Sequence, residues 1–215
     1  MSQLTTLGTE MPLDALSVEL KRRIEARGLG PPRSFVKWAE QILVDHPEQK
    51  ALVVAAGAKV EGNVKLDSDE LLDRGIATVA VLGDLEITGR LTNADSEGGP
   101  FLFVDGDLRA GEILKGGANI IVLGSVVSRG FLICDSSIGA FLAAGDLSAS
   151  AIILCDQDLH AGGTITGPII SEELGNMRAS LVPDVFAEPD DPDDEFACGD
   201  LIRERLEAGL PILKG

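Results

Sequence analysis

The amino-acid sequence predicts a mainly β protein, a right-handed parallel β-helix (solenoid) with short helices at both ends as caps. Three observations predict this class. A Gly-Asp-Leu phrase recurs along the chain, its copies follow each other at steps near twenty residues, and no helical pattern interrupts them between residues 76 and 170. One coil of this length cannot bury its apolar face alone, whereas stacked coils share one continuous core.

Residues 1–50 are expected to form an N-terminal helical cap. Apolar residues recur at three- and four-residue steps, which places them on one helical face: Leu13, Leu16, Leu20 and Ile24. Ser34 is suited to start a second helix that ends before Pro47. Two helices of this kind typically cover the open end of a larger structure.

Residues 51–170 are expected to form the solenoid. The clearest copies of the phrase begin at Gly83, Gly106 and Gly145, and weaker copies contain Gly62, Gly124 and Asp158. Successive glycines lie 21, 23, 18 and 21 residues apart. Two further strands match at an offset of 21 residues. This match predicts that Cys134 and Cys155 share one column of the solenoid and that Asp135 and Asp156 share the next.

Two competing β folds fit less well. A sheet of βαβ units needs amphipathic helices between its strands. A left-handed hexapeptide helix needs an aliphatic residue at every sixth position, and that register reaches the charged Glu97 after Val79, Leu85 and Leu91. The uneven coil length also favours the right-handed form, which tolerates loops at its corners.

Residues 171–215 are expected to form a C-terminal tail. An apolar patch from Leu181 to Phe186 is suited to pack along the solenoid or over its last coil. An acidic, proline-containing linker covers residues 188–195. A last helix, capped by Asp200, is expected from Leu201 to Ala208, with Gly209 ending it.

Composition and charge exclude several function classes. The chain has 215 residues, with 18 basic and 35 acidic side chains and a net charge of −17. An acidic protein repels a phosphate backbone, so no nucleic-acid partner is expected. Aromatic residues make up 4% and Tyr is missing, which argues against a surface that stacks sugars or bases. The sequence shows no export signal, no membrane segment and an odd count of three cysteines, so we expect a cytoplasmic protein.

Few residues suggest catalysis or metal binding. His160 could act as a general base, but no nucleophile is fixed beside it, and strand alternation places it outward. His46 lies at a helix end, where it suits the helix dipole. The cysteines lack the Cys-x-x-Cys spacing of a structural zinc site. We therefore expect no catalytic residue, no metal and no cofactor.

Repeated acidic residues are the more informative feature. Asp84, Asp107 and Asp146 share one repeat position. Each could accept hydrogen bonds from amides at a corner of the solenoid. Alternatively, they could form an acidic ridge that meets a basic protein partner, since stacked like charges are costly unless paired. Under this second hypothesis the partner-binding candidates are Asp84, Glu86, Asp107, Arg109, Asp135, Asp146, Asp156, Asp158 and His160.

The run from Phe101 to Ala110, the Gly-Asp-Leu coils, and the tail segments 181–186 and 203–211 resemble a group of bacterial β-helix proteins described as toxin-associated or polymer-forming. The resemblance covers residues 76–215 and rests on structural repeats, which say little about function. It implies a bacterial cytosolic immunity protein that binds and neutralises a basic toxin domain. One alternative is a bactofilin-like polymer-forming protein, although bactofilins are essentially bare solenoids and this chain carries expected caps. A second is a β-helix enzyme, either a lyase or an acyltransferase.

Overall fold

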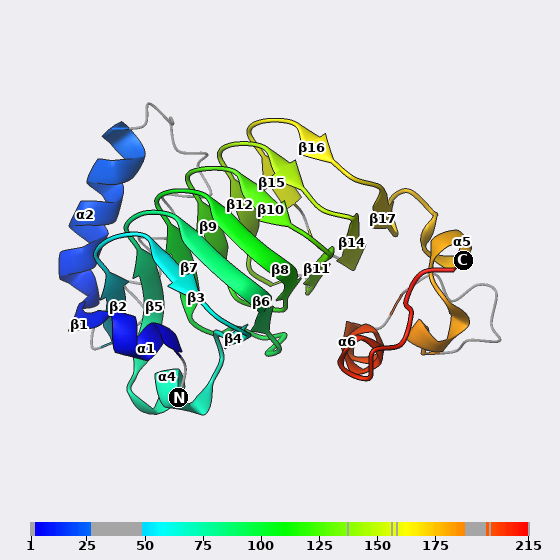
Figure 1. Ribbon diagram of the computed structural model, residues 1–215, viewed down its shortest axis with the longest axis horizontal. Helices are drawn as coiled ribbons and strands as arrows, with labels where there is room; N and C mark the ends of the chain where they lie inside the picture. Colours follow the sequence, from blue (N-terminus) through cyan, green and yellow to red (C-terminus); the bar gives the residue numbers. More distant parts are fainter. Residues whose placement is uncertain are drawn as a thin grey trace.

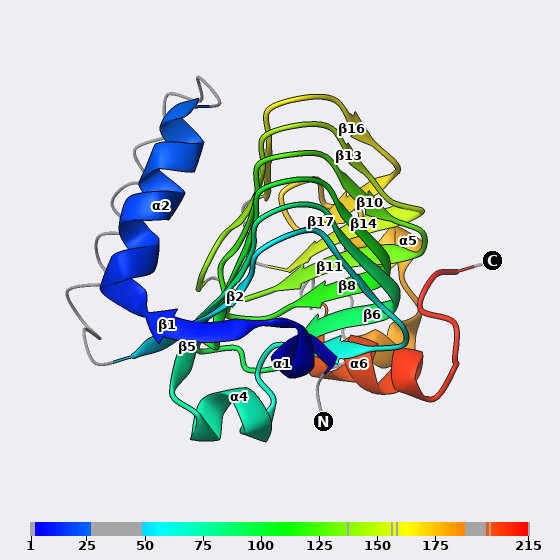
Figure 2. The same ribbon diagram turned by 60° about the vertical axis from the view of Figure 1, so that its left-hand side comes forward.

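The protein is a mainly β solenoid of stacked parallel strands. A computed structural model describes residues 3–26, 49–136, 138–155, 157, 159–187, 197 and 199–214. Strands from successive coils pair in parallel and form a three-sided prism, with the N-terminal elements at one end and the C-terminal helices beside the other (Figures 1 and 2). The predicted β-solenoid is therefore confirmed. The expected second helix, with Ser34 and His46, lies outside the described residues.

Each side of the prism is a ladder of strands, which we call the first, second and third face. The first face contains β2 (Lys50–Val54), β5 (Ile76–Val81), β7 (Phe101–Val104), β9 (Ile120–Val122), β12 (Phe141–Ala143) and β15 (Leu159–Ala161). The second face contains β3 (Ala58–Val60), the first halves of β6 (Leu85–Asn93) and β8 (Leu108–Lys115), β10 (Val126–Ser128), β13 (Leu147–Ser148) and β16 (Ile165–Thr166). The third face contains β4 (Val64–Lys65), the second halves of β6 and β8, β11 (Phe131–Asp135), β14 (Ala151–Cys155) and β17 (Ile169–Ser171).

The Gly-Asp-Leu phrase forms the corner between the first and second faces. Strand pairing places its aliphatic residues in one column inside the prism: Leu85, Leu108, Val126, Leu147 and Ile165. The glycine before this corner position, which holds an acidic residue in most coils and Ser125 in one, lets consecutive coils approach closely. A Cβ at Gly124 would lie 2.4 Å from Asp107 Oδ1 and 2.6 Å from the Gly106 backbone.

Two of the weaker copies were assigned to the wrong corner. Val64 pairs with Leu91, so Gly62 lies at the corner between the second and third faces. Leu159 pairs with Phe141 on the first face, so the segment before it is not a copy of the phrase. The first corner instead contains Gly57 before β3 and Gly163 before Thr164.

The predicted cysteine column is also wrong. Phe131 pairs with Ala151, an offset of 20 rather than 21 residues, so Cys134 lies beside Leu154, and Asp135 lies beside Cys155. Asp156 lies outside the described residues. A slip of one residue moves a side chain to the opposite face of a sheet. Cys134 therefore belongs to the interior core, whereas Cys155 is packed in the cluster on the outside of the third face.

The N-terminal end of the prism is closed. Strand β1 (Thr9–Pro12) pairs antiparallel with β2, and helix α1 (Gln3–Leu7) places Leu4 in the interior core with no exposed surface (Figure 2). Helix α4 (Asp69–Asp73) adds the buried Leu71. The Thr5 hydroxyl donates to the Glu70 carboxylate at 2.5 Å, which joins α1 to α4.

Helix α2 (Leu13–Ala26) confirms the first predicted helix, but it packs along the outside of the first face and not over the open end, which β1 and α1 close. Its buried face carries Leu13, Leu16 and Leu20, which join a cluster with outward-facing residues of the first face such as Phe103. Arg23 of α2 is ion-paired with Asp105, next to the first corner. The first face is thus apolar on both sides, because it is covered outside as well as inside.

The C-terminal segment packs on the outside of the third face. It contains α5 (Met177–Ser180), the 3-10 turn η1 (Pro183–Val185) and α6 (Gly199–Glu207). Its buried side chains, including Phe186 and Ile202, cluster with Ile133 and Ile153. The predicted packing of the Leu181–Phe186 patch along the solenoid is therefore confirmed. The last helix, however, covers a flank of the prism rather than its end.

Candidate functional site

The shared repeat position of the acidic column is confirmed, and its carboxylates bind the backbone of the next coil. Asp84 Oδ1 accepts from the Asp107 amide at 2.8 Å, and Asp107 Oδ1 accepts from the Ser125 amide at 2.9 Å. The Ser125 hydroxyl oxygen takes the same role toward Asp146 at 3.2 Å, and Asp146 Oδ1 accepts from Thr164 at 2.8 Å. Corner hydrogen bonding therefore accounts for the column, and its role in binding a partner stays a prediction.

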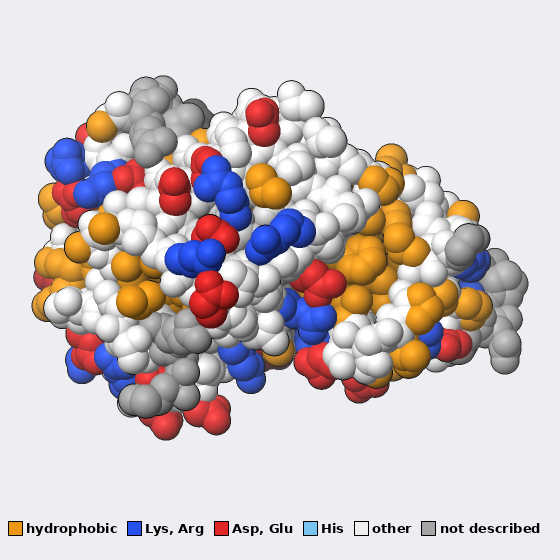
Figure 3. Space-filling model, viewed as in Figure 1, with side chains coloured by type: hydrophobic (Ala, Val, Ile, Leu, Met, Phe, Trp, Pro, Cys, Tyr) orange, Lys and Arg blue, Asp and Glu red, His pale blue; other side chains and the backbone are white. Residues whose placement is uncertain are grey.

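The surface of the second face carries both signs of charge. Arg109 pairs with Asp107 at 2.6 Å, and Lys59 lies 3.5 Å from Glu86. Acidic and basic side chains are interspersed over β3, β6 and β8 in the space-filling view (Figure 3). Among the described residues this face is therefore not the uniformly acidic ridge that the sequence suggested.

The remaining candidates are dispersed. Asp135 lies beneath α6, 3.5 Å from Arg203, and burial raises the pKa of its carboxyl group. His160 is exposed on the outer side of β15, as strand alternation predicted. Asp156 and Asp158 lie outside the described residues. The structure thus does not gather the seven candidates that it describes into one site.

A buried lysine was missed by the sequence analysis. Lys115 is 1% exposed, and its ammonium donates to the carbonyl oxygens of Gly116 at 2.6 Å and Ile138 at 3.2 Å, and to Gln157 Oε1 at 2.7 Å. Burial lowers its pKa to about 8. All three acceptors are neutral, and they belong to the three coils that contain β8, β11 and β14. Lys115 therefore joins these coils where each one leaves the third face.

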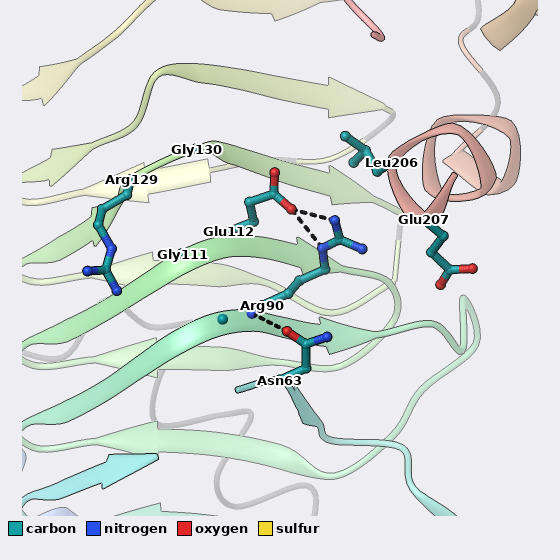
Figure 4. A pocket seen from close by; sticks show the side chains of 9 residues that line it. Asn63, Arg90, Gly111, Glu112, Arg129, Gly130, Leu206 and Glu207 are labelled. Carbon is teal, nitrogen blue, oxygen red and sulfur yellow. Dashed lines mark hydrogen bonds and ion pairs between the residues drawn. The ribbon is translucent and has the colours of Figure 1, made fainter. Parts of the chain in front are cut away.

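A groove separates the second corner of the prism from α6 (Figure 4). The volume of this groove is about 630 Å³. Its floor consists of stacked residues from the turn before β4, from β6, from β8 and from the turn before β11, and α6 supplies one wall. The residues that line this α6 groove are Asn63, Gly89, Arg90, Gly111, Glu112, Arg129, Gly130, Leu206 and Glu207.

The floor of the α6 groove is rigid. Arg90 forms an ion pair with Glu112 at 2.6 Å across adjacent coils, and its backbone amide donates to Asn63 Oδ1 at 2.9 Å. The glycine backbones stack directly, with the Gly130 amide donating to the Gly111 carbonyl at 2.7 Å. A floor that is already ordered loses little conformational entropy when a ligand binds.

Charges without ion-pair partners stand on both sides of this groove. Arg129 is exposed, and within the described part of the chain its guanidinium makes long contacts of 3.4 Å to the carbonyl oxygens of Ile87 and Thr88 and no ion pair. On α6, Glu204 and Glu207 are exposed, and among the described residues neither has an ion-pair partner. The groove can therefore offer the Arg129 cation and the Glu207 carboxylate to a ligand, and Glu204 lies one turn before Glu207 on α6, outside the lining.

The docking of α6 beside the solenoid depends on one close approach. A Cβ at Gly199 would lie 1.5 Å from Asp135 Oδ2, so with any larger residue either the Asp135 side chain or the first turn of α6 must move. The predicted helix, Leu201 to Ala208, lies within two residues of the observed bounds, and Gly209, at φ +68°, follows its end as predicted, but Asp200 lies in the first turn and does not cap the helix. No local sequence signal indicated that this helix would face residues 89–130.

The described residues contain no group of three or more His, Cys, Asp or Glu side chains that could hold a metal ion. Within the same part of the chain, every helix is too short or too polar to cross a bilayer. No known family model matches the chain, and neither the curated proteins nor the solved structures include a detectable relative. Fold and groove together define a β-solenoid with a helix-walled groove on its flank.

Proposed function

We propose that this protein is a non-enzymatic, protein-binding solenoid and that its α6 groove receives a basic segment of a partner protein. The observation that carries the proposal is the exposed Glu207 of α6, which lines the groove beside its ordered floor, with the exposed Glu204 one turn earlier on the same helix. A basic segment along α6 would neutralise these carboxylates, while Arg129 across the groove would select an acidic or carbonyl group next to it.

Net charge supports the same kind of partner. A chain with a net charge of −17 attracts a basic protein over distances of about a Debye length. This attraction raises the association rate more than it raises the affinity of the complex. The side chains that line the groove are amide, guanidinium, carboxylate and aliphatic groups, with no hydroxyl, thiol or imidazole among them. Recognition fits this lining better than nucleophilic catalysis does.

The biological role that we propose is immunity: the partner is a basic bacterial toxin domain, and the complex blocks its action. The support for this finer statement is the sequence resemblance to toxin-associated β-helix proteins together with the acidic charge. Co-expression with the captured partner tests it. Growth should be inhibited by the partner alone and restored when this protein is co-expressed. A partner that does not inhibit growth would contradict the immunity role but not the binding proposal.

The binding site itself is tested by charge reversal with a matched control. Glu204→Lys/Glu207→Lys changes α6, and Glu25→Lys/Glu97→Lys makes the same change in net charge at exposed positions elsewhere. A partner is captured on the immobilised protein from the source bacterium, purified and titrated by calorimetry. We expect the α6 variant to bind at least about tenfold more weakly, since two close charge pairs each contribute on the order of 1 kcal/mol or more.

The control variant should bind within about twofold of the unmodified protein at physiological salt, where distant charges are screened. Equal weakening by both variants would show that only net charge matters and would overturn the groove as the binding site. Failure to capture any protein at micromolar concentration would remove the protein-binding proposal as a whole.

A further inference from the structure

The interior core of the solenoid is open at its C-terminal end. In the column inside the first corner, Leu85, Leu108 and Leu147 have no exposed surface, whereas Ile165 in the last coil is 36% exposed. The neighbouring interior positions of this coil, Leu159 and Ile169, are only partly buried. The last coil therefore presents core side chains to solvent.

The backbone is open at the same end. Each of β15, β16 and β17 is paired on one side only, with β12, β13 and β14 respectively, in the described structure. Hydrophobic side chains gather over β14 and β17 in the space-filling view (Figure 3). Natural proteins usually cover such edges, because unpaired strand edges bind other strands.

The C-terminal segment that the structure describes covers only the β17 part of this end, where Asn176 accepts a hydrogen bond from the Ser171 amide at 2.9 Å and donates one to the Ile169 carbonyl oxygen at 2.9 Å. Helix α6 and the Leu181–Phe186 patch pack on the outside of the third face instead. The opposite end differs, because β1 and Leu4 of α1 cover it.

We infer that two copies of this protein associate tail to tail through their last coils, residues 159–171. The first reason is charge. No acidic or basic residue occurs from Ala161 to Ser171, so the centre of the contact brings no like charges together, while Glu172 and Glu173 follow at its rim. The second reason is shape, since the edges of β15 and β16 beside the exposed Ile165 match the same coil of a second copy better than they match a single extended peptide.

The association is a closed pair. A two-fold axis uses the same surface on both copies, and the covered N-terminal ends then face outward and offer no further site. The contact involves residues 159–171, fewer than the roughly 20 to 30 residues a side of a standard interface. We therefore expect a dissociation constant on the order of 1 to 100 µM.

Sedimentation velocity over a concentration series tests this inference on the full chain. The unmodified protein should shift from monomer to dimer and stop there. Ile165→Arg places a charge at the centre of the contact and should raise the dissociation constant by about a hundredfold or more, because it would bury two like charges. Leu72→Arg, at a 50% exposed leucine near the closed end, adds the same charge and should leave the dimer unchanged.

Two outcomes of sedimentation overturn the inference. One is a monomer at every concentration up to about ten times the upper limit of that range. The other is growth beyond a dimer, which would indicate a filament. Loss of the dimer in Leu72→Arg as well would place the contact elsewhere.

Hydrogen exchange on the unmodified protein gives a second test that needs no variant to fold. Amides in residues 161–170 should become more protected as concentration rises, and protection should increase further when salt is raised, because salt screens repulsion between the two acidic copies. Concentration-independent exchange in this segment would contradict the inference. This site is separate from the α6 groove, so either proposal can fail alone.

Discussion

Asp84 Oδ1 accepts a hydrogen bond from the Asp107 amide of the next coil at 2.8 Å, and Asp107 repeats this bond to Ser125 at 2.9 Å. These bonds run along the axis of the solenoid, so each side chain joins two coils. An acidic residue at this position is therefore explained by the backbone that it satisfies. Its second carboxylate oxygen remains free for a surface pair such as Asp107 with Arg109.

Removing one of these acceptors should destabilise the protein. Asp107→Ala leaves the part-buried Ser125 amide without its partner, at a cost of about 1 to 3 kcal/mol. Asp107→Asn keeps an oxygen at the Oδ1 position and should cost less than about half as much. Urea unfolding measures both free energies. Equal losses for Ala and Asn would show that charge, rather than the hydrogen bond, makes Asp107 important.

Close stacking of the coils should make Gly124 sensitive to a methyl group. Gly124→Ala would place a Cβ 2.4 Å from Asp107 Oδ1 and 2.6 Å from the backbone of Gly106, and we expect a loss of about 2 to 3 kcal/mol in unfolding free energy. Gly98→Ala is the control, because its Cβ would meet open space, and it should change stability by less than about 0.5 kcal/mol. Similar values for the two variants would contradict the observed coil spacing.

Stability should rise with pH because of Lys115. Burial lowers the pKa of this lysine to about 8, whereas an unfolded lysine titrates near 10.4. Below pH 8 both states bind the proton and the folded state bears the cost of burying it. Between these two pKa values the unfolded state binds more protons, so the free energy of unfolding increases, by up to about 3 kcal/mol.

Lys115→Met provides the reference for this pH effect, because it keeps an unbranched side chain but does not titrate. The difference in unfolding free energy between the unmodified protein and the variant should move in favour of the unmodified protein from pH 7 to about pH 10.5. Both proteins retain Cys134 and Asp135 near this position, which leaves Lys115 as the changed titrating group. A difference that stays constant with pH would contradict a lowered pKa at Lys115.

The position of α6 should depend on Gly199. Gly199→Ala would place a Cβ 1.5 Å from Asp135 Oδ2 and 1.7 Å from its Cγ, so the Asp135 carboxylate must leave its place near Arg203 or the helix must move away. We expect limited proteolysis to cut within residues 199–214 at least about ten times faster in this variant, while the solenoid itself keeps its unfolding midpoint. Unchanged cleavage would show that α6 docks without this contact.

The coil architecture could be predicted because its determinants are local. A glycine that permits close stacking, an acceptor for the next coil and an aliphatic core residue follow one another in sequence, as in Gly106-Asp107-Leu108. The strand parity of the third face could not be predicted in the same way. Its strands are apolar on both sides, because the C-terminal segment covers their outer side, so Cys134 and Cys155 carried no alternation to reveal which of them faces inward.

The α6 groove was missed for a different reason. Arg90 and Glu112 come from the solenoid, whereas Leu206 and Glu207 come from a helix about a hundred residues later, and no short motif links them. The direction of α6 is set by tertiary contacts at Gly199 and Arg203 with Asp135. The prediction that this helix would act as a cap relied on its position in the sequence, which does not determine the surface that it covers.

Hydrogen exchange of the protein in complex with its captured partner tests the proposed binding site most directly. The account predicts increased protection in two segments that are distant in sequence, residues 199–210 of α6 and residues 129–130 of the groove floor, with little change on α2. Protection confined to the first face or to the N-terminal end, with α6 exchanging as in the free protein, would contradict it.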